Sequence, residues 1–245
     1  MEIHIINLLR STDRKKRFNE YNLKYIDKYN FFEAIDGNKI NISEISDELY
    51  SKRAINYTPG TIGSALSHLK LWEKSIDLDK PILIMEDDAI VSHDFNNHLN
   101  NVMKMLPENW DILQLSYNFD SVLNYDNTVY EQSYCMFGRK NMTKTDVENF
   151  VNSKIYPTIA RLNNSFGISA YIVSPKGAKI LKRKCFPLDN RLVNIRLPFI
   201  KSKCIRSYTV DCIMNTVYKD INAYVCPIPF VITPHISDEL NTTTR

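Results

Sequence analysis

Short apolar runs alternate with amphipathic segments along most of the chain. Apolar, often β-branched runs of the kind found in strands occupy 2–8, 29–40, 80–89, 110–116 and 166–173. Apolar residues at helical spacing occupy 11–26, 61–76, 92–109 and 174–184. The nearly continuous apolar run at 82–85 is typical of a central strand covered on both faces. The alternation predicts an α/β fold with a mainly parallel central sheet and helices on both of its faces.

Irregular patterns are found at 118–164, 186–207 and 223–240. The first stretch contains one predicted helix, capped by Thr145, and is otherwise polar and aromatic without a clear period. The second is predicted to be loop-rich, and the third to be an extended tail that follows a short helix within 208–219. We predict a single domain over 1–245, in which the segment at about 118–164 is an irregular excursion from the sheet.

Composition and charge place the chain among globular proteins. Hydrophobic residues make up 44% and charged residues 24% of 245 residues, which excludes a disordered or fibrous chain. The net charge of +3 is compatible with an anionic ligand or a membrane surface and requires neither. No basic region followed by a long apolar stretch opens the sequence and no run approaches a membrane helix, so we expect a cytoplasmic protein. The five cysteines lack C-x-x-C spacing, and we interpret them as reduced thiols.

Three consecutive carboxylates follow the apolar run at 82–85. Glu86, Asp87 and Asp88 lie where that strand is predicted to end, and ligands of open α/β sheets gather at such ends. Carboxylate oxygens suit Mg²⁺ or Mn²⁺, which commonly link protein carboxylates to substrate phosphates. A solvated acidic turn is the alternative interpretation. With six glycines and no glycine-rich phosphate loop, a phosphate ligand would depend on a metal and on basic side chains.

Several motifs in one order extend this picture. The stretches INLLRSTDRKKRF, FFEAIDG, GTIGSALSHLKLWEK, ILIMEDDA, GISAYIVSPKGAKIL and YTVDCIM are spread over most of the chain. In this order they resemble glycosyltransferase family 25, the sugar transferases of lipooligosaccharide biosynthesis and of procollagen. The resemblance implies a type A glycosyltransferase fold, which is Rossmann-like, and a uridine diphosphate (UDP) sugar donor. It also implies a divalent metal, usually Mn²⁺ or otherwise Mg²⁺, and inversion at the anomeric carbon.

The resemblance assigns roles to the acidic residues. EDD matches the family's D-x-D-like motif, so Asp88 is the first expected metal ligand, and Glu86 is the second, through water or the donor ribose. Asp87 is expected at the donor or on the opposite face of the strand, since neighbouring side chains alternate. Asp211 matches the position of the general base that takes the acceptor proton, with an exposed helix cap as the alternative. Asp189 is the competing base, although a turn role is favoured for it.

The first two motifs are expected to bind the donor nucleotide. Asn7, Leu8 and Arg10 end the first strand, where the nucleotide should lie, and Arg10 is placed to meet a phosphate. A surface arginine in a basic run is the alternative for Arg10. Asp36 is expected at uracil or ribose, and simple Asp-Gly turn chemistry is the alternative for it.

The remaining candidates come from a helix, a strand and the tail. Ser67 and His68 are predicted to project from a helix surface beside the donor, or to order the loop that holds the acidic triplet. His235 is expected as a further metal ligand, against a structural or solvated histidine. Gly167 and Ser169 begin a strand near the sugars, and close packing explains the glycine equally well. The family often has an acidic residue in the segment GTIGSA, and this chain does not.

These inferences point to an inverting, metal-dependent transferase. It would move a hexose, galactose before glucose, from UDP to a terminal sugar of bacterial lipooligosaccharide, with peripheral contact at the inner face of the inner membrane and no nucleic-acid partner. A metal-dependent nucleotidyltransferase or phosphohydrolase stays open, as does a non-catalytic carbohydrate-binding protein on a degenerate transferase fold. The donor sugar, acceptor, linkage and oligomeric state depend on pocket shape, which the sequence does not encode.

Overall fold

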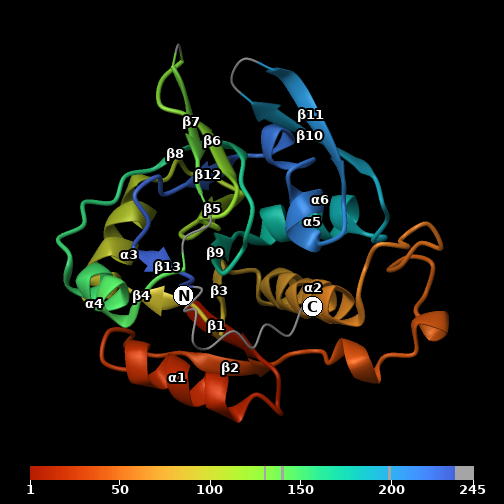
Figure 1. Cartoon of the computed structure of the whole chain (residues 1–245), viewed down its shortest axis with the longest axis horizontal. Coiled ribbons are helices and arrows are strands. Elements are labelled where there is room, and N and C mark those ends of the chain that lie inside the picture. Colours follow the sequence, from red (N-terminus) through yellow and green to blue (C-terminus); the bar gives the residue numbers. More distant parts are fainter. Residues whose placement is uncertain (130, 139–140, 198–199, 235–245) are drawn as a thin grey trace.

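A nine-stranded sheet forms the centre of the molecule (Figure 1). The computed structural model describes residues 1–129, 131–138, 141–197 and 200–234. Across the sheet the strands are ordered β2 (Asn30–Glu33), β1 (Glu2–Asn7), β3 (Ile82–Glu86), β9 (Ala170–Val173), β5 (Ile112–Gln114), β12 (Ala223–Val225), β8 (Ala160–Asn164), β6 (Val122–Asp126) and β7 (Gln132–Met136).

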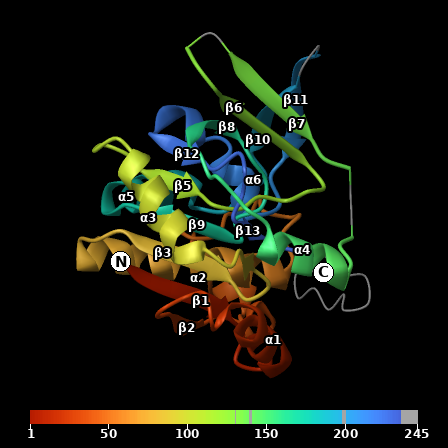
Figure 2. The same ribbon diagram turned by 90° about the vertical axis from the view of Figure 1, so that its left-hand side faces the viewer.

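Helices cover both faces of this sheet, as the sequence predicts (Figures 1 and 2). They are α1 (Thr12–Asn22), α2 (Pro59–Leu78), α3 (Phe95–Met105), α4 (Lys144–Asn152), α5 (Pro175–Cys185) and α6 (Val210–Met214), joined by the short 3-10 turns η1 (Gly37–Lys39), η2 (Ile42–Glu44) and η3 (Tyr218–Asp220). Ile82 and Ile84 of β3 pack in the core that holds α2, α5 and α6. Leu83 and Met85, which point the opposite way, pack with α1 and α3. The fully apolar strand is therefore explained by two cores, one on each face.

Strand directions differ from the prediction of a mainly parallel sheet. Among the described residues, β1 runs parallel to β2 and β3, and β5 runs parallel to β12, whereas the other five neighbouring pairs are antiparallel. β9 enters between β3 and β5 in the antiparallel sense. The prediction of a mainly parallel sheet is wrong because a strand buried on both faces has the same apolar pattern in either direction.

Three segments with weak patterns form regular strands. The segment at 118–164 contributes β6, β7 and β8 to the sheet, so it is not an irregular excursion. The stretch predicted to be loop-rich forms the hairpin of β10 (Leu192–Leu197) and β11 (Ile200–Arg206). β6 and β7 are partly exposed and lie at one edge of the sheet, where burial does not impose a strong alternation.

The C-terminal stretch is also part of the fold rather than an extended tail. β12 pairs with β5 and β8 inside the sheet, and β13 (Val231–Ile232) pairs with β4 (Ile90–Val91), directly after the acidic triplet. The predicted helix within 143–154 is α4, but its cap is Thr143, whose hydroxyl accepts a hydrogen bond from the amide of Asp146. In the described part of the chain, no helix combines the length and apolar character that crossing a bilayer demands.

Candidate functional site

One cavity lies where β1 and β3 end, between α1, α2 and α6. Because β1 and β3 are parallel, their carboxyl ends meet at the same edge of the sheet. The cavity has a volume of about 280 Å³. Its walls include nine of the predicted site residues: Leu8, Arg10, Asp36, Ser67, Glu86, Asp87, Asp88, Gly167 and Asp211. Segments separated by more than 100 positions in the sequence thus meet in one site.

A buried chain of hydrogen bonds leads from the core to Glu86. The indole Nε1 of Trp72 donates to the hydroxyl of Tyr171 (2.7 Å), and this hydroxyl lies 2.9 Å from Nδ1 of His68. Nε2 of His68 lies 3.4 Å from Oε1 of Glu86. Trp72 can only donate, so the consistent arrangement has Tyr171 donating to Nδ1 and His68 donating from Nε2 to Glu86. Burial opposes ionisation of Glu86, but the contact with His68 and the charge of Arg14 together outweigh it and lower the pKa of Glu86.

His68 therefore does not line the cavity but supports Glu86 from the buried side. The side chains of His68 and Ser67 are fully buried, so the prediction that both project from the helix surface is wrong. The reason is that α2 packs against the sheet, which buries the apolar and the small polar positions facing it. His68 holds a residue of the acidic triplet, and the alternative reading, a hydrogen bond that orders the triplet, describes it better.

A Tyr171→Phe variant is expected to lose about 2–6 kcal/mol of unfolding free energy, because two buried polar groups, on Trp72 and His68, lose their partner at about 1–3 kcal/mol each. Chemical denaturation should show a lower midpoint with an unchanged slope. Tyr156→Phe is the matched control, since Tyr156 is 66% exposed and removal of its hydroxyl leaves no buried polar group without a partner. Equal stability of the two variants would contradict the proposed chain of hydrogen bonds.

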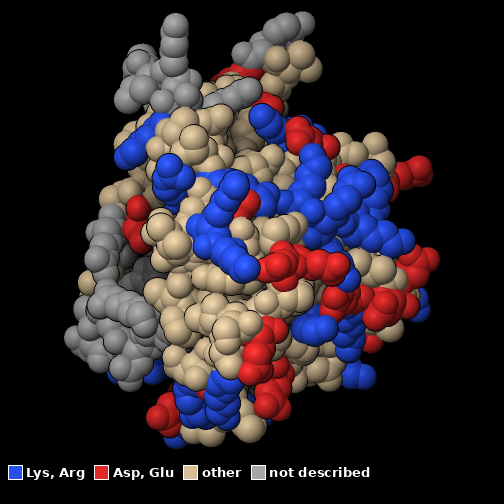
Figure 3. Space-filling model, turned by 90° about the vertical axis from the view of Figure 1, so that its right-hand side faces the viewer, with Lys and Arg blue, Asp and Glu red and all other residues tan. Residues whose placement is uncertain are grey.

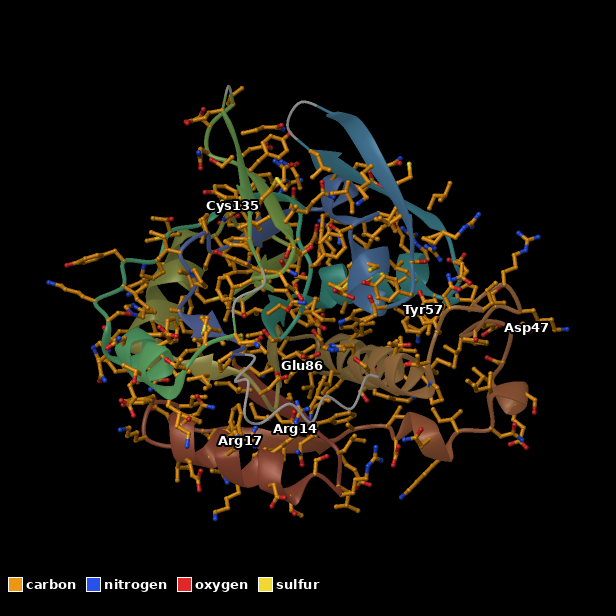
Figure 4. All side chains as sticks on the ribbon, viewed as in Figure 1. Arg14, Arg17, Asp47, Tyr57, Glu86 and Cys135 are labelled. Carbon is orange, nitrogen blue, oxygen red and sulfur yellow. The ribbon has the colours of Figure 1, made fainter. Side chains whose placement is uncertain are left out.

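Asp87 and Asp88 share a cation from α1. Arg14 of α1 lies near Glu86 (Figure 4) and forms ion pairs with Asp87 and, at 3.2 Å, with Oδ2 of Asp88. Asn7, buried at the end of β1, donates from Nδ2 to Oδ2 of Asp87 (2.6 Å). Glu86 thus leans toward α2 and Asp87 toward α1, as the alternation along a strand requires. The positive charge of Arg14 reduces the repulsion among the three adjacent carboxylates at the end of this apolar strand.

The relief that Arg14 provides is incomplete. Burial and the neighbouring charge of Glu86 raise the pKa of Asp88 to about 7, although Arg14 acts in the opposite sense. Burial also raises the pKa of Asp87, against the effects of Arg14 and Asn7. The site therefore retains an excess of negative charge that a further cation would neutralise.

A divalent cation fits this carboxylate cluster. Oδ1 of Asp88 is buried and has no hydrogen-bond partner among the described residues, which leaves an oxygen ligand for a metal. In the same part of the chain, no group of three or more His, Cys, Asp or Glu side chains is placed to hold a metal alone. Mg²⁺ and Mn²⁺ do not need such a cage, because one or two carboxylates with waters and substrate phosphates suffice. His235 lies outside the described residues, and its ligand role stays a prediction.

The N-terminal wall of the cavity is built around Asp36. Arg10 forms an ion pair with Asp36, and the carboxylate of Asp36 also caps η1 by accepting from the amide of Asn38 (3.1 Å). Oγ of Ser67 accepts from the amide of Ile35 (2.8 Å), which fixes the loop that carries Asp36. The turn role weighed for Asp36 is thus observed, and its pairing with Arg10 gives the wall both a cation and an anion.

Asp211 lines the cavity from the start of α6. Its Oδ2 accepts from the amide of Gly167 (2.9 Å), and its Oδ1 accepts from the hydroxyl of Thr209. Gly167 has φ of +81°, and a Cβ there would lie 2.2 Å from Oδ1 of Asn118, so only glycine fits. Two hydrogen bonds therefore hold the carboxylate toward the cavity, and each oxygen keeps a lone pair for a further proton donor.

Asp189, the competing base, does not line this cavity. Its Oδ1 accepts from Nε (2.6 Å) and the backbone amide of Arg191 (3.2 Å), so it holds a turn. Sequence reasoning missed several polar residues that line the cavity, among them Arg14, Asn118 and Thr233. Only Arg14 had any signal, since it belongs to the basic run on the helix that follows β1, the strand parallel to β3.

Comparison with known proteins identifies the family of this chain. The model of the family described as glycosyltransferase family 25 (LPS biosynthesis protein) matches residues 1–189. The chain belongs to glycosyltransferase family 25. The matched residues include the acidic triplet, Arg14 and the Ser67–His68 pair, whereas Asp211 and Thr233 lie beyond them. The resemblance carried by the colinear motifs is thus confirmed.

Curated relatives of this family 25 chain include transferases of animals. Procollagen galactosyltransferase 2 of Homo sapiens is 29% identical over 194 residues, which cover 74% of this chain and 27% of the human protein. A glycosyltransferase 25 family member of Aedes aegypti is 27% identical over 73% of this chain and 27% of its own length. The chain therefore spans about a quarter of the relatives it matches. A crystal structure of a protein from STIV aligns with 94% of this chain and 83% of its own at 11% identity and a TM-score of 0.37.

Proposed function

We propose that this family 25 chain is an inverting, metal-dependent hexosyltransferase with a type A fold. It would transfer a hexose, galactose before glucose, from a UDP-sugar to a terminal sugar of bacterial lipooligosaccharide. One observation carries the proposal: a single cavity brings the acidic triplet and two arginines together with the carboxylate of Asp211. Family membership and relatives named galactosyltransferases support transfer of a hexose.

The donor would occupy the half of the cavity formed by the ends of β1 and β3. Asp88, with Glu86 beside it, would hold the divalent ion. Arg10, now paired with Asp36, would turn to a phosphate oxygen, and Asp36 would then be free for the ribose. A bound Mn²⁺ or Mg²⁺ would neutralise charge that develops on the leaving diphosphate. Asn7 and Arg14 would keep Asp87 in place, and the His68 contact would orient Glu86. These residues bind and orient the donor without touching the acceptor.

Asp211 would act on the acceptor. In an inverting transfer the acceptor hydroxyl attacks the anomeric carbon, the bond from that carbon to the diphosphate oxygen breaks, and a base takes the hydroxyl proton. Asp211 lines the same cavity as the triplet and is held by hydrogen bonds from Gly167 and Thr209, so its remaining lone pairs would be available to the acceptor hydroxyl. The proton would move from the acceptor oxygen to a carboxylate oxygen of Asp211.

Release of free UDP tests this function. A panel of UDP-sugars would be incubated with and without Mn²⁺ and with and without truncated lipooligosaccharide acceptors. We expect release that depends on both metal and acceptor, fastest with UDP-galactose. Donor breakdown irrespective of acceptor would indicate a phosphohydrolase or nucleotidyltransferase instead. Glycan binding without turnover for any donor would indicate a carbohydrate-binding protein.

A further inference from the structure

A second, open cleft lies beside the catalytic cavity. We call it the arginine cleft; it is lined by Arg53, Ile55, Asn56, Asp189, Asn190, Arg191 and Arg206. It faces the side of the molecule that carries residues 40–57 and the β10–β11 hairpin, where Lys and Arg side chains gather (Figure 3). None of its residues has a part in the chemistry proposed above.

The arginine cleft carries uncompensated positive charge. Arg191 is fully engaged in its floor, because it donates to Oδ1 of Asp189 (2.6 Å) and to the carbonyls of Lys184 (2.5 Å) and Pro187 (3.1 Å). That ion pair also uses the one carboxylate among the lining residues. Arg206 is exposed and donates to the carbonyl of Asn190 at 3.3 Å, and Arg53 is exposed with no carboxylate partner among the described residues. Two guanidinium groups are thus presented to a ligand.

A hydrogen-bond acceptor accompanies these two cations. Oδ1 of Asn190 is buried and has no partner among the described residues, while its Nδ2 is engaged with the carbonyl of Ser207 (2.8 Å). A ligand that offers a hydroxyl beside an anionic group would match both features. A sugar that carries a phosphate or a carboxylate has this combination.

Two chain segments join the arginine cleft to the catalytic cavity. Arg53, Ile55 and Asn56 line the cleft, and Gly60 and Thr61 line the cavity a few residues later. On the other wall, Arg206 lines the cleft and Thr209 the cavity, so their Cα atoms are at most about 11 Å apart.

The connecting wall ends at the proposed base. Tyr208, which is 51% exposed, lies between Arg206 and Asp211 in the sequence, and an exposed aromatic ring there would suit contact with a sugar ring. The cleft therefore adjoins the wall of Asp211, where the acceptor is proposed to enter.

We propose that the arginine cleft is an acceptor subsite that binds an anionic sugar, phosphorylated or carboxylated, next to the sugar that receives the hexose. Arg53 and Arg206 bind the anion, and planar guanidinium groups suit phosphate and carboxylate equally. This inference rests on the proposed transfer to a glycan. It adds that the acceptor is negatively charged near its transfer site.

Binding of small sugars tests the subsite without a donor or turnover. Galactose, galactose 6-phosphate and galacturonate would be titrated against the full chain by ligand-observed NMR. The two anionic sugars are expected to bind more tightly than galactose. An Arg53→Ala/Arg206→Ala double variant should weaken binding of the anionic sugars by about tenfold or more, since charge-assisted hydrogen bonds are lost, and leave galactose binding unchanged.

A Lys28→Ala/Lys104→Ala double variant is the matched control. Both lysines are exposed and lie outside the cleft, so this variant loses the same formal charge and should bind every sugar as the wild type does. Stronger loss with galactose 6-phosphate than with galacturonate identifies the anion as phosphate, and the reverse identifies it as carboxylate. The proposal is overturned if neutral and anionic sugars bind equally, or if both double variants lose the same affinity. In a parallel titration with phosphatidylglycerol vesicles, binding to the vesicles and to none of the anionic sugars would also overturn it. UDP release from a neutral acceptor, without anionic-sugar binding, would leave the proposed function standing while this subsite fails.

Discussion

An Asp211→Asn variant is expected to lose about 10²–10⁴-fold in kcat, because general base catalysis contributes that much and an amide does not take up the acceptor proton. The substitution preserves shape and local hydrogen bonds. Its Oδ1 can accept from the amide of Gly167, while its Nδ2 donates to the hydroxyl of Thr209, which is also an acceptor. Folding should thus be retained, and the loss should fall on the chemical step. Steady-state UDP release with saturating donor and acceptor measures it.

Binding separates this chemical role from a structural one. UDP affinity with Mn²⁺ should be unchanged in Asp211→Asn, since Asp211 is proposed to contact the acceptor and not the metal. Asp220→Asn is the matched control: Asp220 lies just after α6, 2.9 Å from Lys184 on the surface, and does not line the cavity. If Asp211→Asn kept kcat within tenfold of the wild type, the base would have to be another group.

β3 and Asp211 differ in how well the sequence pattern predicts them. The apolar run at 82–85 followed by three carboxylates predicts both a central strand and a polar site at its end, because burial and the strand period leave few other solutions. Asp211 could be placed only by resemblance to the family. Its position depends on the positive φ of Gly167 and on α6 packing near α2 and α5, and neither leaves a periodic signal.

Arg14 and His68 show the limits in more detail. Both contact the acidic triplet directly. In the sequence, however, Arg14 is one basic residue of a run and His68 is one polar residue of a helix. Deciding that Arg14 faces β3, and that His68 faces inward, requires the rotation of α1 and α2 about their axes. Tertiary packing sets that rotation, and polar residues with partners can then be buried. The same argument applies to strand direction in the sheet.

An Asp88→Asn variant is expected to lose metal-dependent binding of UDP, by an order of 100-fold or more in affinity, since even residues that only support a metal ligand cost 10–100-fold when changed. Calorimetric titration of UDP with and without Mn²⁺ measures this loss. UDP binding without metal should differ little, because Arg10 is unaffected. The same Asp220→Asn control should keep the full metal effect. Equal metal dependence in Asp88→Asn and wild type would remove Asp88 from the metal site.

Thermal stability gives a second test of Asp88 that needs no substrate turnover. Since the pKa of Asp88 is raised from 3.8 to about 7, its carboxyl group favours the folded state while protonated, and this contribution is lost as the pH rises from about 4 to about 7. Asp88→Asn removes a charge that costs stability near neutrality, so its Tm relative to wild type should rise over that interval. With UDP present at pH 7, adding Mn²⁺ should raise the Tm of the wild type further and leave that of the variant unchanged, because the ion stabilises the ionised carboxylate only where one is present. A Tm difference between wild type and variant that did not change with pH would mean that the charge of Asp88 is already balanced by Arg14, and the argument for a cation at this site would fail.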